Sequence, residues 1–106
     1  AIHFVEGLAA REPKNSELQT LLGALYARYK QLDKSAAAYR KALEMDPKAS
    51  EPRLGLARIA ISQGKDEDAI TQLQAAVKEQ PSHPLAVLLI AGLYDRLLAS
   101  DLGGPP

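Results

Sequence analysis

Residues 50–81 read SEPRLGLARIAISQGKDEDAITQLQAAVKEQP, and residues 16–47 show the same pattern as SELQTLLGALYARYKQLDKSAAAYRKALEMDP. Small and large apolar residues recur at the same offsets in both stretches, and each stretch ends in a proline. Pro13, Pro47 and Pro81 are therefore spaced 34 residues apart. A period of 34 residues is typical of repeats that each contain two helices. The chain is thus predicted to be an all-α array built by repetition.

Two sets of residues recur at offsets that suit pairs of packed helices. Small side chains allow two helices to approach closely, and large ones fill the seams between them. The small set comprises Gly23, Ser35, Ala42, Ala57, Ala69 and Ala76. The large set comprises Leu22, Tyr26, Leu32, Tyr39, Leu43, Leu56, Ile70, Leu73 and Val77.

Helix boundaries follow from the prolines and from residues that commonly begin helices. Each proline disfavours helical geometry in the preceding residue, so it marks the end of a second helix. Ser16 with Gln19 resembles a capping box, Ser50 is a second N-cap candidate, and Asp33 and Asp66 stand before the second helices. The predicted helices are residues 16–29, 33–46, 50–63 and 67–80, with turns at residues 30–32 and 64–65.

Both ends of the chain match incomplete repeats. Residues 1–13 align with the second helix of a repeat, because Ile2 matches Ile70 and Pro13 matches Pro81. Residues 83–99 align with a first helix that has no second helix after it. Residues 103–106, GGPP, are expected to be a flexible tail. We therefore expect a section of a longer array that contains one half repeat, two full repeats and one unpaired helix.

The shared positions carry a resemblance to a known family. At these positions the first full repeat has Leu22-Gly23, Tyr26, Ser35, Tyr39, Ala42 and Pro47. The second full repeat has Leu56-Ala57, Ala60, Ala69, Leu73, Ala76 and Pro81 at the aligned positions. This pattern resembles the tetratricopeptide repeat family. The resemblance implies a right-handed superhelical array of antiparallel helix pairs, about six helices in all, over residues 1–102. It also implies a concave groove that binds a peptide or a partner protein.

In that family the groove is lined by the first helix of each repeat. Carried over position by position, the resemblance implies these partner-binding residues: Glu17, Thr20, Ala24, Arg28, Glu51, Leu54, Arg58, Ile61, Leu88, Asp95 and Arg96. Arginine forms forked hydrogen bonds with carboxylates. An acidic ligand with apolar anchors would therefore suit the groove, although the arginines also fit a solvated surface and the apolar residues also fit inter-repeat packing.

One subset of the family holds a C-terminal carboxylate with lysine, asparagine and arginine at fixed groove positions. The corresponding residues of this chain are Thr20, Ala24, Gly55, Leu85 and Leu89. None of them provides a cation or an amide for a charge-assisted hydrogen bond. Binding of that particular kind is therefore disfavoured.

The last predicted helix is apolar around most of its circumference. A terminal helix of a repeat array needs a polar outer face, whereas residues 85–98 contain leucine, isoleucine and valine at seven positions between Val87 and Leu98. A further repeat, a second copy of the chain or a ligand is expected to cover it. Self-association into a homo-oligomer through this helix is the alternative to partner binding in the groove.

Composition argues against several other functions. Thirteen basic and thirteen acidic residues give no net charge, which disfavours a nucleic-acid footprint. The chain has no cysteine, and His3 and His83 have no catalytic or ligand spacing around them. We therefore expect no enzyme activity, cofactor or metal. The apolar stretch near the C-terminus is too short for direct membrane insertion, and the compartment stays open between cytoplasm and periplasm.

Overall fold

The computed structural model describes residues 2–101, without the side chains of residues 100 and 101. Within that range the chain forms six helices and no strands, as the sequence predicts. They are α1 (Ile2–Arg11), α2 (Ser16–Arg28), α3 (Leu32–Met45), α4 (Ser50–Ser62), α5 (Asp66–Glu79) and α6 (Pro84–Asp101). The four predicted helices agree with α2 to α5 to within one residue at each end. The expected tail, residues 103–106, lies outside the described residues.

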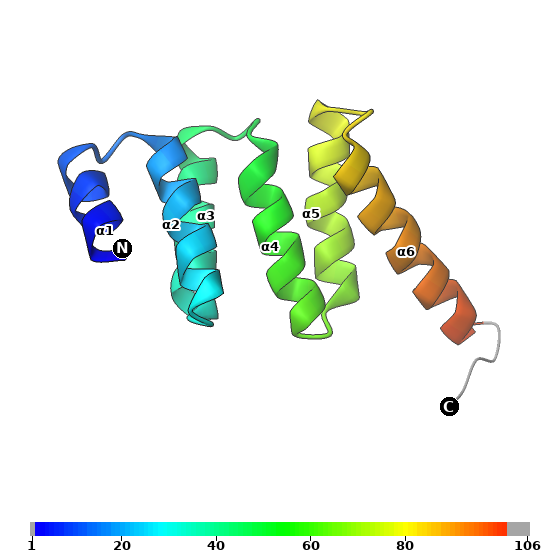
Figure 1. Cartoon of the computed structure of the whole chain (residues 1–106). Coiled ribbons are helices and arrows are strands. Elements are labelled where there is room, and N and C mark those ends of the chain that lie inside the picture. The colour runs from blue at the N-terminus through cyan, green and yellow to red at the C-terminus, as the bar shows by residue number, and fades with distance from the viewer. Residues whose placement is uncertain (1, 102–106) are drawn as a thin grey trace.

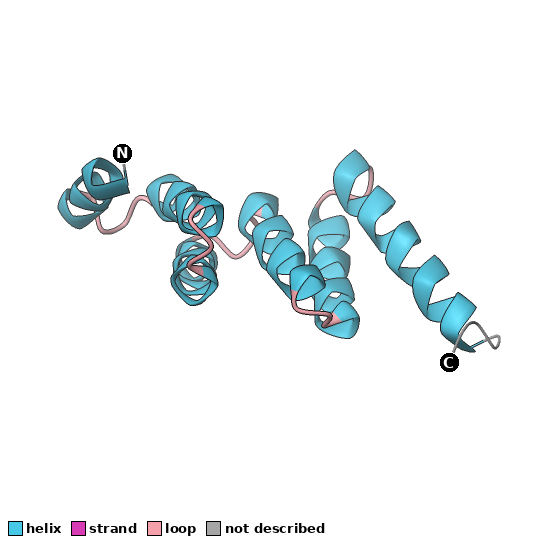
Figure 2. Ribbon diagram, turned by 60° about the horizontal axis from the view of Figure 1, so that its bottom comes forward, coloured by secondary structure: helices cyan, strands magenta, loops and turns pink. Residues whose placement is uncertain are grey.

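The helices follow one another in chain order across an elongated body of 52 × 28 × 18 Å (Figure 1). The pairs α2–α3 and α4–α5 each pack side by side, and α4 also packs on α3 and α2. The unpaired helices extend the array at its two ends, α1 against α2 and α6 against α5. Figure 2 shows α3 beneath α2 in a second view of the same arrangement. The molecule is an all-α solenoid of stacked helix pairs.

Both first helices of the full repeats end in the same left-handed turn. Lys30 has φ 60° and Gly64 has φ 74°, and the two positions are one repeat apart. The amide of the next residue bonds back to a carbonyl five residues earlier, over 2.9 Å from Gln31 to Tyr26 and over 2.8 Å in the second repeat. These residues lie in the turns predicted at 30–32 and 64–65.

The predicted helix caps differ from the observed ones by one residue. Asn15 is the N-cap of α2, and its side-chain oxygen accepts a hydrogen bond from the Leu18 amide over 3.2 Å. Ser16 and Ser50 are instead the first residues inside their helices. Asparagine and serine are similarly good caps, so composition alone does not select between neighbours.

The acidic residues that were expected to precede the second helices lie within them. Asp33 is in the first turn of α3, and Asp66 is the first residue of α5. The residues before these helices, Gln31 and Lys65, make no side-chain capping bond. An acid in the first turn still interacts favourably with the positive end of the helix dipole.

Tyr39 is the largest side chain at the junction of the two repeats. It is 6% exposed, and its ring lies between the backbones of Gly23 in α2 and Gly55 in α4. A Cβ atom placed on Gly23 would lie 2.6 Å from the ring, far inside van der Waals contact. Close by, the fully buried Ser35 hydroxyl donates to the Gly23 carbonyl over 2.6 Å. Small residues are needed here because the helices approach one another around this ring.

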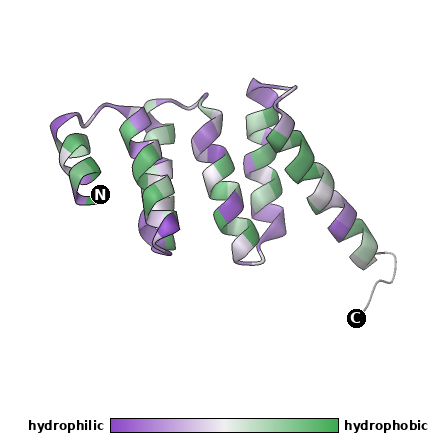
Figure 3. Cartoon of the chain, in the orientation of Figure 1, coloured by the Kyte–Doolittle hydropathy of each residue, from purple (hydrophilic) through white to green (hydrophobic). Residues whose placement is uncertain are grey.

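Helix α6 is fixed on one side and open on the other. Ala86 and Leu93 are buried in the core that α4 and α5 share with it. Arg96 forms a two-pronged ion pair with Asp66 of α5, at 2.6 and 2.9 Å. Apolar residues make up most of α6, as the green bands along this helix in Figure 3 show. The exposed large side chains are Val87, Leu88, Tyr94 and Leu98.

None of the helices in the described part of the chain combines the length and the hydropathy that a bilayer crossing requires.

Candidate partner-binding groove

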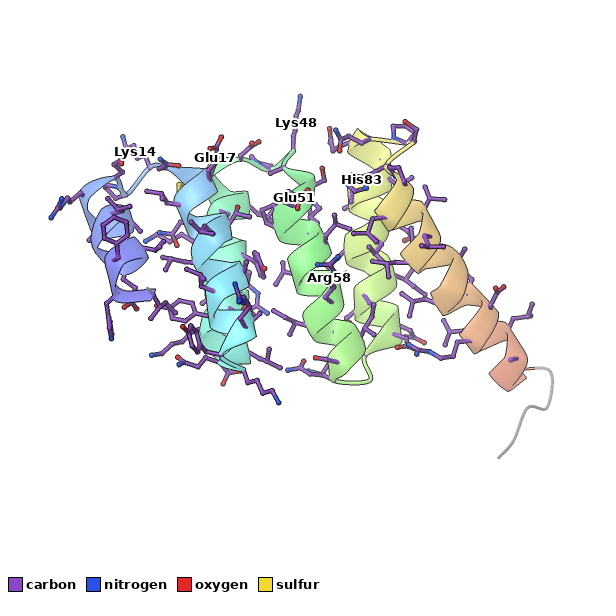
Figure 4. All side chains as sticks on the ribbon, viewed as in Figure 1. Lys14, Glu17, Lys48, Glu51, Arg58 and His83 are labelled. Carbon is purple, nitrogen blue, oxygen red and sulfur yellow. The ribbon has the colours of Figure 1, made fainter. Side chains whose placement is uncertain are left out.

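A pocket of about 170 Å³ lies where the first helices of three successive repeats meet. Helix α2 contributes Thr20 and Ala24, helix α4 contributes Glu51, Leu54, Gly55 and Arg58, and Leu85 comes from α6. Five of the eleven predicted groove residues therefore lie around one hollow: Thr20, Ala24, Glu51, Leu54 and Arg58. Figure 4 shows Glu51 and Arg58 on the same face of α4.

The five residues do not offer the same amount of surface. Arg58 and Glu51 are exposed, and Thr20 is half-buried. Leu54 is only 3% exposed and belongs to the core that joins α4, α5 and α6. For Leu54 the inter-repeat packing interpretation therefore accounts for nearly all of the side chain.

Tyr39 also lines the pocket, although it belongs to the second helix of its repeat. Burial raises the pKa of the Tyr39 phenol above its usual value; the charge of Arg58 acts in the opposite direction, and that of Glu51 raises the pKa further. Both charges therefore act on the phenol. The pocket combines a neutral phenol, a cation and a carboxylate above an apolar wall.

His83 is the other pocket residue that the sequence analysis did not assign to the groove. It lies in the loop before α6, and its Nδ1 accepts a weak hydrogen bond from the Ala86 amide over 3.4 Å. The side chain thus has a structural role as a helix cap while one edge faces the pocket. The first-helix offsets could not have included it, because it precedes the helix.

The other predicted groove residues lie outside this pocket. Glu17, Arg28 and Asp95 are exposed, and Leu88 is 68% exposed on α6. Ile61 is half-buried against the core around Leu73. Arg96 is already paired with Asp66, so its guanidinium faces α5 and has fewer donors left for a ligand. The structure therefore separates one compact cluster from residues distributed along the array.

The described residues contain no group of three or more histidine, cysteine, aspartate or glutamate side chains that could hold a metal ion.

Comparisons with known proteins address the fold. A family model described as tetratricopeptide repeat matches residues 29–93, and a second model with the same description matches residues 1–50. The chain therefore belongs to the tetratricopeptide repeat family, whose arrays generally mediate protein–protein interactions.

Among solved structures, 57 chains match, and no curated protein does. One of the solved structures is described as MamA MSR-1 C2, with a TM-score of 0.74 and 22% sequence identity. The match covers 94% of this chain and 57% of the other, so this chain spans little more than half the length of that relative. At this identity the similarity concerns the fold alone.

Proposed function

We propose that this chain is a protein-binding module whose concave groove holds a peptide segment of a partner, with the pocket around Arg58 as the anchor. The observation that carries the proposal is the convergence of residues from α2, α4 and α6 on one hollow. Both full repeats and the last helix contribute to it, so the pocket exists only when these parts of the array are assembled. Extended surfaces of this kind are what repeat arrays use for binding.

The charges of the pocket specify the chemistry of the ligand. Arg58 is exposed, forms no hydrogen bond or ion pair within the described residues, and can donate several bonds to one carboxylate. Glu51, two helical turns earlier on the same helix, can accept a bond from an amide or an amine. The half-buried Leu85 offers an apolar contact beside them. We therefore expect a peptide with an acidic residue for Arg58 and a neighbouring apolar side chain.

Selection from a random peptide library tests this proposal without assuming a sequence. Wild-type protein should enrich peptides that contain aspartate or glutamate next to leucine or another large apolar residue. Arg58→Glu should weaken their binding about tenfold or more, because a charge-assisted bond becomes a repulsion. Affinities would be measured by fluorescence anisotropy with the purified full chain.

Arg40→Glu is the matched control, because it makes the same charge change on an exposed arginine of a second helix, away from the groove. Circular dichroism would show that both variants keep the helical fold. The proposal is wrong if the two variants bind the selected peptides equally, or if the enriched peptides carry no acidic residue.

The exposed side of α6 favours self-association as a second candidate function. Val87, Leu88 and Leu98 present apolar surface there, where a further repeat could pack. Leu88→Glu places a charge on that surface without altering the core, because Leu88 is exposed. Leu89 is less suitable for this test, because its side chain is half-buried against the core. Sedimentation should then show a wild-type dimer that the substitution dissociates. A wild-type monomer at high concentration excludes this candidate.

A further inference from the structure

The hydroxyl of Tyr39 is a buried donor that has no partner in the described part of the chain. The side chain is only 6% exposed, yet its oxygen takes part in none of the hydrogen bonds among the described residues. Two other tyrosines do bond across helices, Tyr26 to the Glu6 carboxylate and Tyr94 to the Gln74 amide. A buried donor without a partner destabilises a fold. The Tyr39 hydroxyl therefore requires an explanation other than folding.

The ring brings this hydroxyl to the groove. Its Cζ atom, which bears the hydroxyl, is the atom nearest to the place of a Cβ on Gly55, and both residues line the groove pocket. Among side-chain polar atoms of the described residues, only Arg53 Nε is both without a partner and closed off from solvent. The Tyr39 oxygen is therefore accessible, and the pocket is the open space that its side chain lines.

The other polar side chains of the pocket are either engaged or charged. The Thr20 hydroxyl donates to a main-chain carbonyl of its own helix over 3.0 Å, and His83 Nδ1 accepts from a main-chain amide of α6. Arg58 makes no hydrogen bond or ion pair within the described residues. Burial raises the pKa of the Tyr39 phenol, so the hydroxyl keeps its proton. Tyr39 and Arg58 therefore provide two donors for a ligand.

The two donors lie close enough to bind one carboxylate. Glu51, Gly55 and Arg58 follow one face of α4 at spacings of four and three residues. Arg58 is therefore about 4.5 Å along the helix axis from Gly55, where the phenol reaches α4. Glu51 lies on the other side of Gly55, roughly 10 Å from Arg58 along the axis. A ligand carboxylate between Arg58 and the phenol is thus separated from the like charge of Glu51.

We propose that the Tyr39 hydroxyl determines the specificity of the groove pocket, by donating to one oxygen of an acidic ligand side chain whose other oxygen binds Arg58. This role rests on the proposed function, because it concerns the same pocket. An ion pair with an exposed arginine contributes little by itself, since water and salt screen it. A hydrogen bond from a buried donor to a charged acceptor is stronger. Tyr39 thus favours a carboxylate over its amide, which has one acceptor oxygen.

Titration of the full chain with two small acids, followed by amide NMR spectra, tests this role. The acids are N-acetyl-aspartyl-leucinamide and N-acetyl-glutamyl-leucinamide, and their asparagine and glutamine counterparts are the neutral ligands. At least one acid should bind more tightly than its amide, in the millimolar range that suits so small a ligand, with saturable shifts at Thr20, Ala24 and Arg58. Tyr39→Phe should weaken that acid about tenfold and its amide only a few-fold.

Tyr26→Phe is the matched control, because it removes the same atom from a tyrosine that does not line the groove pocket and that bonds Glu6. It should lower the free energy of unfolding in urea and leave the preference for the acid intact. Tyr39→Phe should do the reverse, because it removes no hydrogen bond within the protein.

The outcomes separate this role from the proposed function. If Arg58→Glu weakens the acid but Tyr39→Phe weakens acid and amide equally, or neither, the role of Tyr39 is overturned and the groove remains the binding site. If neither acid gives saturable shifts in the pocket, or Arg58→Glu leaves the affinity unchanged in a folded protein, the proposed function is wrong and the role of Tyr39 falls with it.

Discussion

Replacing Gly55 by alanine should destabilise the array, although alanine favours a helix more than glycine does. Gly55 lies within α4, where its backbone faces the ring of Tyr39. A Cβ atom at this position would lie 2.7 Å from the Tyr39 Cε1 atom and closer still to two other ring atoms. The opposite side of the ring is closed by Gly23, so the ring cannot retreat without moving α2.

The size of the effect follows from two opposing contributions. Restoring an ordinary carbon–carbon contact requires the ring to move by about 1 Å, and forcing an extra methyl into a packed core costs about 1–3 kcal/mol. Alanine recovers about 1 kcal/mol of helix propensity. Because a rigid ring held on both sides relaxes little, we expect the overpacking cost to lie at the upper end of that range, about 3 kcal/mol. After the gain of about 1 kcal/mol in helix propensity, the net loss is about 2 kcal/mol.

A double-mutant cycle isolates the contact. One repeat later, the equivalents of Gly23, Tyr39 and Gly55 are Ala57, Leu73 and Leu89, a smaller central residue between larger neighbours. Tyr39→Leu should therefore accommodate Gly55→Ala, with a favourable coupling energy above about 1 kcal/mol. Chemical denaturation of the four proteins measures this coupling.

Gly92→Ala in α6 is the control, because no atom lies within 4 Å of the position that its Cβ would take. This substitution should stabilise the protein by up to about 1 kcal/mol. If Gly55→Ala stabilises the protein equally, or if its effect adds to that of Tyr39→Leu within about 0.5 kcal/mol, Tyr39 is not the wedge that separates the repeats.

Three further predictions concern single sites. Asn15→Ala should lower the free energy of unfolding, measured by urea denaturation, by about 1 kcal/mol. Ser16→Ala should lower it much less, because only the Asn15 side chain accepts a hydrogen bond from the Leu18 amide. Equal losses in the two variants would show that Ser16 also caps the helix. Lys30→Gly should stabilise by about 1 kcal/mol by relieving a left-handed backbone, and an unchanged urea midpoint would contradict this. The hydrogen bond from Tyr26, then that of His3, lowers the pKa of Glu6 below its usual 4.5. This stabilises α1 above that pH, and the stabilisation is lost as pH falls through the lowered pKa. Amide exchange in α1 should therefore accelerate there more in wild type than in Tyr26→Phe, which keeps only the contact with His3; equal acceleration in the two proteins would contradict this.

The helix array could be predicted from the sequence because its main determinants are periodic. Proline spacing and alternating small and large residues define helix pairs whatever the detailed packing, and the observed helices follow them closely. The caps were misplaced by one residue because Asn15 and Ser16 are both good caps and only the backbone geometry chooses between them. Periodicity therefore predicts which segments are helical better than it predicts the residue at which each helix begins.

The candidate site was predictable only in part. First-helix offsets identify Arg58 and Glu51 because those helices form one face of the array. The same offsets cannot identify Tyr39, which reaches the pocket from a second helix, or the interhelical ion pair of Arg96 with Asp66, whose residues lie 30 positions apart.

Amide NMR titration with an acidic, leucine-containing peptide selected from the library tests the central claim most directly. We predict shifts concentrated at Thr20, Ala24, Glu51 and Arg58, at least tenfold weaker binding after Arg58→Glu, and no loss after Arg40→Glu. Shifts confined to α3 and α5, or binding that Arg58→Glu leaves unchanged in a folded protein, would show that the groove formed by the first helices is not the site at which this chain binds its partner.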